Sequence, residues 1–391
     1  MPTNFSLSAG QLYCGINNVD HALHNQCIHV VDGRVEHITD ATLGASSRDP
    51  HFDYSGCIVA PGFIDLQVNG GGGVMFNDCT TIEQVEQILA AHRSHGTVSM
   101  LPTLISATEP HIVRARALME HAHHHHVAGL LGIHLEGPFI NPNNNGAHKQ
   151  SLLRGATAAD LPLLAPLASG VTLVTLAPEI ASSGVINALS SAGVRVFIGH
   201  TSASHSQTLE ALAQGAVGFT HLFNAMGSFS GREPGVIGTA LNDPNSWCSI
   251  IVDGYHVHQS NLKMALTNKP KGKVLLVTDA MSSVGGPNSF MLDGQQIYVE
   301  DGRCINPQGR LAGAHLGMDQ AVSNCVSMLG LPLAEALRMA STYPAQAMGL
   351  EAEMGFIKPG YRASFTILDA QLKVKAVMLD GQLYPQTDAL Q

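Results

Sequence analysis

The stretch Gly132-Ile133-His134-Leu135-Glu136-Gly137-Pro138 places a carboxylate directly after a short apolar run. The same pattern recurs three more times, with the ionisable residues His200, His221 and Asp279. In a barrel of parallel strands the carboxyl ends of the strands converge on one face, so residues far apart in sequence can surround one ion. One carboxylate and two imidazoles suit a zinc site that keeps a position open for water, and a further aspartate can manage the protons of that water.

Short apolar runs alternate along the centre of the chain with longer segments of helical spacing, as in Ile82–His95 and Ala203–Gln214. The apolar runs are Ile58–Leu66, Thr97–Ile105, Leu130–Leu135, Val171–Leu176, Val194–Ile198, Ala216–Thr220, Ser249–Val252 and Val274–Thr278. Strands that alternate with helices favour a parallel sheet, and about eight such units favour a closed barrel. The sequence therefore predicts an α/β fold built on a (β/α)8 TIM-like barrel.

The two ends of the chain contain shorter alternating runs, which are typical of antiparallel strands. Cys27–Val31 and Arg34–Ile38 flank Asp32-Gly33, a hairpin signal, and Ala363–Leu368 near the other end alternates in the same way. We therefore expect a small β-sandwich domain that both chain ends build together. The predicted limits are residues 1–58 and 356–391 for this small domain and residues 59–355 for the catalytic barrel.

The composition narrows the classes of partner. The chain has 20 Lys and Arg against 30 Asp and Glu, a formal net charge of −10, so we expect no nucleic-acid partner. No apolar segment reaches the ~20 residues of a membrane helix, and Met1–Ser6 lacks the basic start of a signal peptide. We therefore expect no membrane contact and a cytoplasmic location. The seven cysteines form no Cys-x-x-Cys pair, which argues against a disulfide framework and a zinc ribbon.

Each candidate also has a purely structural explanation. Glu136 could cap a strand, His200 and His221 could be buried core histidines, and Asp279 could be the N-cap of a helix. Repetition at the same place on successive strand-helix units favours a shared ion instead. The tract His121–His126 is interpreted as a surface segment, because consecutive side chains on a helix point in different directions.

Seven short motifs carry a family resemblance. They are Pro61–Asp65, His134–Pro138, Gly199–Thr201, Thr220–Met226, Gly231–Gly235, Asp253–His256 and Val277–Ala280. Together they resemble the N-acetylglucosamine-6-phosphate deacetylases, a family of the amidohydrolase superfamily. The resemblance implies a hydrolase of amino-sugar catabolism that removes the acetyl group of N-acetyl-D-glucosamine 6-phosphate to give D-glucosamine 6-phosphate and acetate.

The resemblance also implies roles for the residues near the reaction centre. Glu136, His200 and His221 match the ligands of one divalent metal ion, expected to be zinc, that activates the attacking water. Asp279 matches the catalytic aspartate that shuttles the proton, and His148 matches a residue that contacts the substrate near the scissile amide.

Further positions match the binding site for a small-molecule sugar phosphate. The matched substrate-binding residues are Ala147, His148, Asn224, Ala225, Arg232, His256, Leu311, Ala312 and Gly313. Arg232 has the planar guanidinium that suits a phosphate monoester. The resemblance suggests that the loop carrying Arg232 crosses to a partner subunit, and it therefore implies a homodimer.

One position departs from the wider superfamily. Most amidohydrolases carry His-x-His just after the first strand, where it helps to bind a second metal, but here the same place carries Gln67 and Asn69. Amides replace imidazoles poorly as ligands of transition metals. We therefore interpret Gln67 and Asn69 as a vestigial second-metal position and expect one ion per chain.

Two other functions stay open. The substrate could be another N-acetylated sugar phosphate, such as N-acetylgalactosamine 6-phosphate, because one inverted hydroxyl would change few of the matched residues. The chain could also be a metal-free scaffold of the same fold with an assembly or regulatory role. Retention of Glu136, His200, His221 and Asp279 together argues against the scaffold.

Overall fold

The computed structural model describes residues 4–41 and 49–386, so residues 1–3, 42–48 and 387–391 of the predicted small domain lie outside the described residues. Contacts between residues group the chain into two compact units. Their limits are Met1–Asp65, His92–Ser99 and Gly317–Gln391 for the first unit, and Leu66–Ala91 and Met100–Leu316 for the second. The domain limits from the sequence stay a prediction. Among the described helices, none is long and apolar enough to cross a membrane.

An eight-stranded sheet forms the barrel, in the order β14-β13-β12-β11-β10-β9-β8-β5. Its strands are β5 (Phe63–Val68), β8 (Thr97–Ile105), β9 (Gly132–Glu136), β10 (Val171–Leu176), β11 (Arg195–Ile198), β12 (Gly218–Phe219), β13 (Trp247–Ile250) and β14 (Val274–Leu276). The ladders from β8 to β14 are parallel. A parallel bridge between Val68 and Ala280 connects the first strand with the segment after the last. The predicted barrel is therefore confirmed as a nearly closed sheet.

The first predicted barrel strand, Ile58–Leu66, is in fact parts of two strands. β4 (His51–Pro61) pairs with β19 (Phe365–Leu368) in another sheet, and the barrel strand β5 begins only at Phe63. Both parts are buried, so the apolar run shows no change of sheet. Gly62 lies between them, where an added Cβ would come within 2.4 Å of the Val98 side chain. Hydrophobic periodicity cannot detect such a transition.

Helices follow most strands of the barrel, as the spacing predicts. They are α1 (Ile82–Arg93), α2 (Glu109–His124), α3 (Leu161–Leu164), α4 (Val185–Ser191), α5 (His205–Ala213), α6 (Gly235–Asn242) and α7 (Gln259–Asn268), with α8 (Met318–Ser327), α9 (Leu333–Ala340) and α10 (Thr342–Met348) later in the chain. α5 shows why a helix begins where it does. The Ser204 hydroxyl accepts from the backbone of Gln207, whose side chain accepts from the backbone of Ser204, a capping box.

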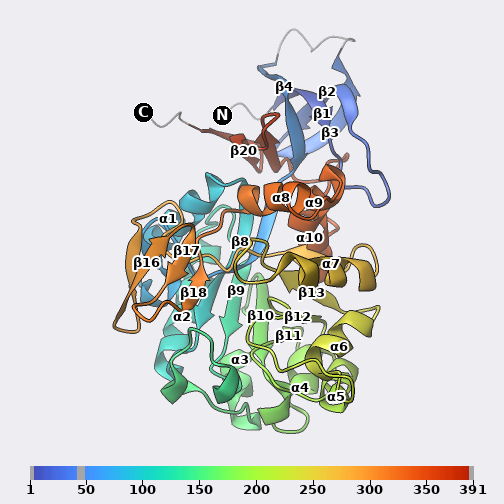
Figure 1. Cartoon of the computed structure of the whole chain (residues 1–391). Helices are drawn as coiled ribbons and strands as arrows, with labels where there is room; N and C mark the ends of the chain where they lie inside the picture. Colours follow the sequence, from blue (N-terminus) through green and yellow to red (C-terminus); the bar gives the residue numbers. More distant parts are fainter. Residues whose placement is uncertain (1–3, 42–48, 387–391) are drawn as a thin grey trace. The chain divides into compact units, whose positions relative to one another are not determined.

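Both chain ends contribute to one seven-stranded sheet, in the order β21-β20-β19-β4-β1-β2-β3 (Figure 1). Besides β4 and β19 it contains β1 (Asn4–Leu12), β2 (Leu23–Val31), β3 (Arg34–Asp40), β20 (Val374–Leu379) and β21 (Gln382–Pro385). The predicted hairpin at Asp32-Gly33 is present, since Val31 pairs with Arg34. Buried side chains from both ends, including Phe5 and Phe365, share one core. The predicted β structure built from both chain ends is thereby confirmed, as one mixed sheet.

A four-stranded antiparallel sheet follows the last barrel strand and was not predicted from the sequence. It consists of β15 (Ser289–Leu292), β16 (Gln295–Glu300), β17 (Arg303–Ile305) and β18 (Leu311–Ala314). Phe290 and Ile297 of this sheet pack in one buried cluster with Ile105 and Met281. Because Ile105 and Met281 lie at the carboxyl edge of the barrel, this packing brings β18 to the same edge.

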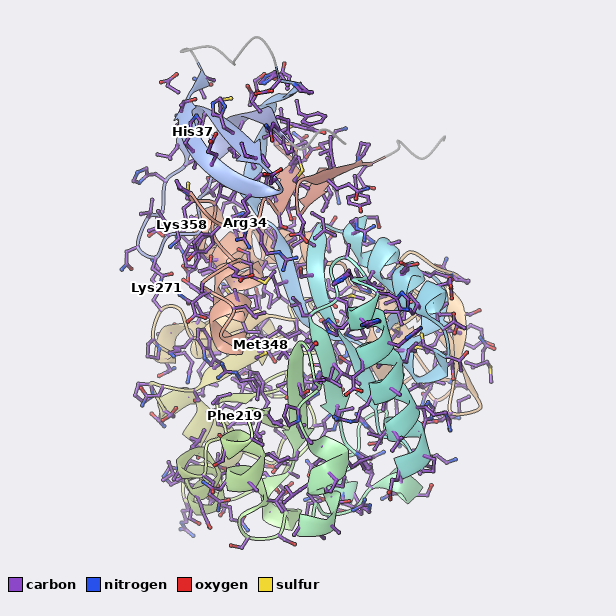
Figure 2. All side chains as sticks on the ribbon, turned by 180° about the vertical axis from the view of Figure 1, so that it is seen from behind. Arg34, His37, Phe219, Lys271, Met348 and Lys358 are labelled. Carbon is purple, nitrogen blue, oxygen red and sulfur yellow. The ribbon has the colours of Figure 1, made fainter. Side chains whose placement is uncertain are left out.

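The strands of the barrel are buried on both faces, so their side chains form nearly continuous buried runs. Figure 2 shows the side chains from behind, with Phe219 of β12 labelled; this ring is 0% exposed. Deeper in the barrel, His134 contacts Thr103 and Thr175 with its two ring nitrogens, at 3.2 and 2.8 Å. Burial lowers the pKa of His134 to about 4, so this histidine is a neutral core residue.

Candidate active site

Four strand ends place ionisable side chains at one edge of the barrel. β9 ends at Glu136, and His200, His221 and Asp279 follow β11, β12 and β14 within a few residues. The φ angles of His200, His221 and Asp279 are 50°, 32° and 53°, in the left-handed region. Such a conformation costs roughly 1–3 kcal/mol per residue and is concentrated at functional sites. Backbone strain therefore marks three of the four predicted positions.

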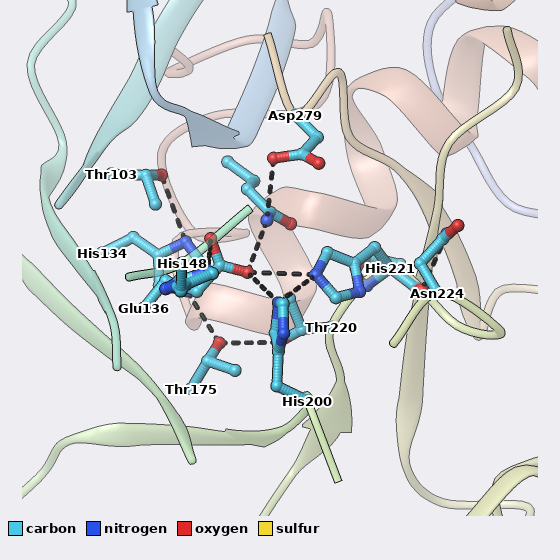
Figure 3. A network of polar contacts seen from close by, with 12 residues as sticks. Thr103, His134, Glu136, His148, Thr175, His200, Thr220, His221, Asn224 and Asp279 are labelled. Atoms are coloured by element: carbon cyan, nitrogen blue, oxygen red, sulfur yellow. Dashed lines mark hydrogen bonds and ion pairs between the residues drawn. The ribbon is translucent and has the colours of Figure 1, made fainter. Parts of the chain in front are cut away.

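Three of these side chains direct their donor atoms at one point (Figure 3). Nε2 of His221 lies 3.0 Å from Oε1 of Glu136 and 3.0 Å from Nε2 of His200. The distance from Nε2 of His200 to the same carboxylate oxygen is 3.4 Å. All three residues are almost fully buried, with at most 4% exposure. The structure therefore brings the predicted ligands together.

The proton positions also fit a metal ion. Nδ1 of His200 lies 2.8 Å from the carbonyl oxygen of Asn144, which can only accept, so this nitrogen carries the proton. The Nε2 lone pair of a neutral His200 ring then faces Glu136 and His221. Ligands that bind at about 2.0–2.1 Å in a tetrahedron lie roughly 3.3 Å apart, close to the observed spacings. The residues present thus fit a divalent cation, and the Asn144 carbonyl fixes the orientation of one ligand.

His148 is a second candidate for the ligand set. Among the described residues, the donor atoms of Glu136, His148 and His200 lie within 4.8 Å of one another, and Nε2 of His148 is 3.9 Å from Oε2 of Glu136. His221 is the better third ligand, because its Nε2 lies 3.0 Å from Glu136 and 3.0 Å from His200, whereas His148 lies 3.9 Å from Glu136. Burial, followed by the nearby charge of His200, lowers the pKa of His148 to about 3. His148 is therefore a neutral imidazole beside the predicted metal position.

The two carboxylates of the site have opposite pKa shifts. Burial alone would raise the pKa of Glu136, but hydrogen bonds with His200 and His221 outweigh it and hold this pKa well below its ordinary value. Burial, and then the charge of Glu136, raise the pKa of Asp279. Two carboxylates whose environments push their pKa values apart are suited to different tasks. Glu136 is suited to remain an anion, and Asp279 is suited to exchange a proton.

The side chains of Gln67 and Asn69 donate hydrogen bonds to both carboxylates of the site. Nε2 of Gln67 donates to Oε1 of Glu136 at 2.8 Å and to Oδ1 of Asp279 at 3.1 Å. Nδ2 of Asn69 donates to the same Asp279 oxygen at 2.7 Å. Amide groups that donate to carboxylates present hydrogens rather than lone pairs to the site. The role of Gln67 and Asn69 as a vestigial second-metal position stays a prediction.

A cavity of about 200 Å³ opens above these residues. Its lining includes the predicted substrate-binding residues Ala147, His148, Asn224, Ala225, His256, Leu311 and Gly313. Ala312, also predicted, does not line this cavity; it is 4% exposed and lines a neighbouring groove. Ile105 and Met281 line the cavity and were not predicted, although Ile105 ends β8 and Met281 follows Asp279 by two residues, which is the signal that could have identified them.

The loop after β9 shapes one wall of the cavity. Gly146, Ala147 and His148 line the cavity. The carboxylate of Glu179, which the sequence analysis missed, connects this loop with the segment after His200, since it accepts from the Asn141 amide and from the hydroxyl of Thr201. Glu179 follows β10 in the same way that Glu136 ends β9, so the strand-end pattern could have revealed it.

His256 lies at another wall of the cavity. Its Nδ1 is 2.5 Å from Oδ2 of Asp253, whose other oxygen accepts from the backbone N–H groups of Tyr255 and His256. Burial would raise the pKa of Asp253, but the His256 side chain outweighs it and lowers this pKa. Asp253 thus occupies Nδ1 of His256, so Nε2 is the ring nitrogen that can contact a ligand.

Arg232 stands apart from the other predicted residues. It is exposed and does not line the cavity. The neighbouring Glu233 carboxylate accepts from the backbone N–H groups of His205 and Gly235. The nearby Phe229 side chain is 57% exposed. Within this one chain, the structure therefore does not bring Arg232 to the site.

The histidine tract does not form a metal site of three or more ligands in the described chain. α2 ends at His124, and His121, His124, His125 and His126 are exposed while His123 is half-buried. The rings of His121 and His125 pack edge to face with their centroids 4.4 Å apart. The interpretation as a surface segment agrees with this exposure.

Comparison with known proteins gives matches over most of the chain. The sequence model of the amidohydrolase family matches residues 58–384. An N-acetylgalactosamine-6-phosphate deacetylase of Shewanella sp. (strain ANA-3) is 37% identical over 363 residues, which cover 92% of each chain. An N-acetylglucosamine-6-phosphate deacetylase of Homo sapiens is 40% identical over 358 residues, 87% of each chain. The crystal structure of N-acetylglucosamine-6-phosphate deacetylase from Pasteurella multocida superposes with a TM-score of 0.93 at 31% identity, covering 98% of this chain and 100% of that one.

Proposed function

Because this chain belongs to the amidohydrolase family, we propose that it hydrolyses the acetamide of N-acetyl-D-glucosamine 6-phosphate to D-glucosamine 6-phosphate and acetate. The observation that carries the proposal is the convergence of Glu136, His200, His221 and Asp279 below one cavity. Relatives that cover nearly the whole chain have the same activity in their names.

One divalent metal ion per chain, proposed to be zinc, would be held by Glu136, His200 and His221. These three donor atoms lie 3.0–3.4 Å apart, and the Gln67 amide donates to the same carboxylate. When bound there, a divalent ion supplies Lewis-acid chemistry, since it acidifies water and polarises a carbonyl oxygen.

Asp279 carries the proton in the proposed reaction. It takes a proton from the attacking water and later delivers it to the departing amine, which leaves poorly unless it is protonated. Its raised pKa, caused by burial and then by Glu136, suits this exchange. Asn69 and Gln67 hold one carboxylate oxygen through their amide groups, so the other oxygen is the one that exchanges the proton.

His148 stabilises the oxyanion that develops when the carbonyl is attacked. Its neutral ring lies in the cavity wall with Nε2 near Glu136. A buried donor fixed in place before the reaction lowers the energy of the developing charge without reorganisation.

The sugar phosphate is held at the other side of the cavity. Asn224, Ala225 and His256 line that wall, and Leu311 and Gly313 of the inserted sheet cover the ligand. Since Arg232 lies outside the cavity of its own chain, we assign its phosphate contact to a second copy of the chain in a homodimer. The cytoplasmic location belongs to the same proposal.

The galacto sugar is the competing substrate. One of the similar relatives is an N-acetylgalactosamine-6-phosphate deacetylase with 37% identity over 92% of the chain, so identity alone does not separate the two sugars. The scaffold alternative is disfavoured, because the site retains a complete ligand set in contact distance.

Acetate release tests both points in one experiment. The purified protein is supplied with N-acetylglucosamine 6-phosphate or N-acetylgalactosamine 6-phosphate, each with and without a chelator. We expect chelator-sensitive acetate release with a higher kcat/KM for the gluco sugar. A higher kcat/KM for the galacto sugar would show that N-acetylgalactosamine 6-phosphate is the preferred substrate. No acetate release from either sugar would refute the proposed function.

A further inference from the structure

Ser106 directly follows β8 and contacts the ring of His148. Its backbone nitrogen lies 3.2 Å from Nδ1 of His148, and its hydroxyl oxygen lies 2.8 Å from the same atom. Ser106 is 6% exposed, so these contacts are shielded from water. Neither the motif pattern nor the proposed reaction assigns a role to this serine.

The backbone contact decides where the His148 proton lies. A backbone N–H can only donate, so Nδ1 of His148 must accept. A neutral ring then carries its proton on Nε2. A doubly protonated ring would bring Nδ1–H against the N–H of Ser106, so the same contact disfavours it.

This proton placement determines what His148 can do. Nε2 faces the cavity 3.9 Å from Oε2 of Glu136 and has no lone pair for a metal ion. His148 is thereby excluded from the ligand set, although its distance to Glu136 and His200 would allow it. An Nε2–H donor beside the reaction centre suits the carbonyl oxygen of an acetamide.

Gly137 makes room for the serine hydroxyl. Its φ is +84°, and an added Cβ would lie 2.3 Å from Oγ of Ser106 and 3.6 Å from Nδ1 of His148. The turn after Glu136 therefore has the one residue type that leaves space for this contact. The hydroxyl approaches Nδ1 more closely than the backbone nitrogen does.

We propose that Ser106 is a positioning residue that holds the His148 proton on Nε2, so that His148 meets the substrate as a hydrogen-bond donor. This inference rests on the proposed deacetylation, because it assigns His148 to the carbonyl oxygen. Ser106 acts through His148 and does not itself touch the substrate.

The test combines nuclear magnetic resonance with kinetics on the full-length, zinc-loaded protein. Histidine labelled with ¹⁵N reports which ring nitrogen is protonated, and the His148→Asn spectrum identifies the signals of His148. We expect a protonated Nε2 and an unprotonated Nδ1.

Ser106→Ala keeps the backbone donor but removes the hydroxyl, so the Nδ1–H form should become detectable and kcat should fall roughly fivefold, the equivalent of one hydrogen bond. KM and zinc content should stay within about twofold, since one hydrogen bond to another residue is lost.

Two further variants separate this role from general support of the fold. Ser106→Thr retains the hydroxyl and should restore kcat. Ser99→Ala removes another buried hydroxyl from β8, where Ser99 is 0% exposed, and should leave kcat unchanged.

The outcomes that overturn the proposal are specific. A wild-type spectrum with the proton on Nδ1 would refute it, even if Ser106→Ala did not fold. Equal kcat values and spectra for Ser106→Ala and Ser99→Ala would also refute it. If no acetate were released from either sugar phosphate, the proposed function would fail, whereas the wild-type spectrum would still decide the proton position.

Discussion

The side-chain amide of Asn69 donates a hydrogen bond of 2.7 Å to Oδ1 of Asp279. This contact holds one oxygen of a buried carboxylate in place from the predicted vestigial second-metal position. Asn69→Leu should therefore lower kcat by about tenfold or more, because a hydrogen bond to a charged group contributes roughly 1.5–3 kcal/mol. Bound metal should stay unchanged, since the Asn69 amide donates to Asp279, which is not one of the three predicted ligands. Loss of metal from Asn69→Leu would show instead that the amide supports the metal site.

Asp279→Asn separates proton transfer from binding. We expect bound metal and substrate affinity to be retained while turnover falls by at least ~10²-fold, the usual scale for lost general acid–base catalysis. Single-turnover acetate release and metal analysis measure the two effects. A variant that stays nearly as active would leave Asp279 with only a structural role.

Glu136→Gln should have the opposite signature. The neutral amide replaces the only carboxylate among the three predicted ligands, so metal occupancy itself should fall. Elemental analysis of the dialysed protein, with Asp279→Asn as the matched control, distinguishes the two carboxylates. Full occupancy in Glu136→Gln would remove Glu136 from the ligand set.

Arg232→Ala tests the contact with phosphate. We expect KM for the phosphorylated sugar to rise by a factor that corresponds to ~2 kcal/mol or more of lost binding free energy, as for a lost charge-assisted contact. The weak hydrolysis of unphosphorylated N-acetylglucosamine should change little. Mixing Arg232→Ala with Asp279→Asn protein should restore some activity if the arginine acts across a homodimer. Equal losses on both sugars would instead assign Arg232 to the fold or the assembly.

The sequence predicted the centre of the site well because strand ends are easy to recognise. Glu136, His200, His221 and Asp279 each follow an apolar run, and parallel strands in a barrel bring such positions together. The left-handed backbone angles of His200, His221 and Asp279 could not be predicted, since αL geometry at His or Asp depends on the surrounding structure.

Other features depend on contacts that a pattern in one segment does not contain. Gly62 separates the buried end of β4 from β5 of a different sheet, and these two segments have the same apolar character. The proposed role of Ser106 depends on its contact with His148, which lies 42 positions later in the sequence. For Arg232, the motif match identified the loop but could not predict that this side chain lies outside the cavity of its own chain.

Reconstitution with metal tests the central claim most directly. The protein is stripped of metal, zinc is added in steps, and acetate release from N-acetylglucosamine 6-phosphate is measured at each step. The account predicts that activity rises in proportion to zinc and levels off near one ion per chain, since three ligands form one site beside the Gln67 and Asn69 amides. Acetate release that needs two ions, or that is absent at every zinc level, would contradict it.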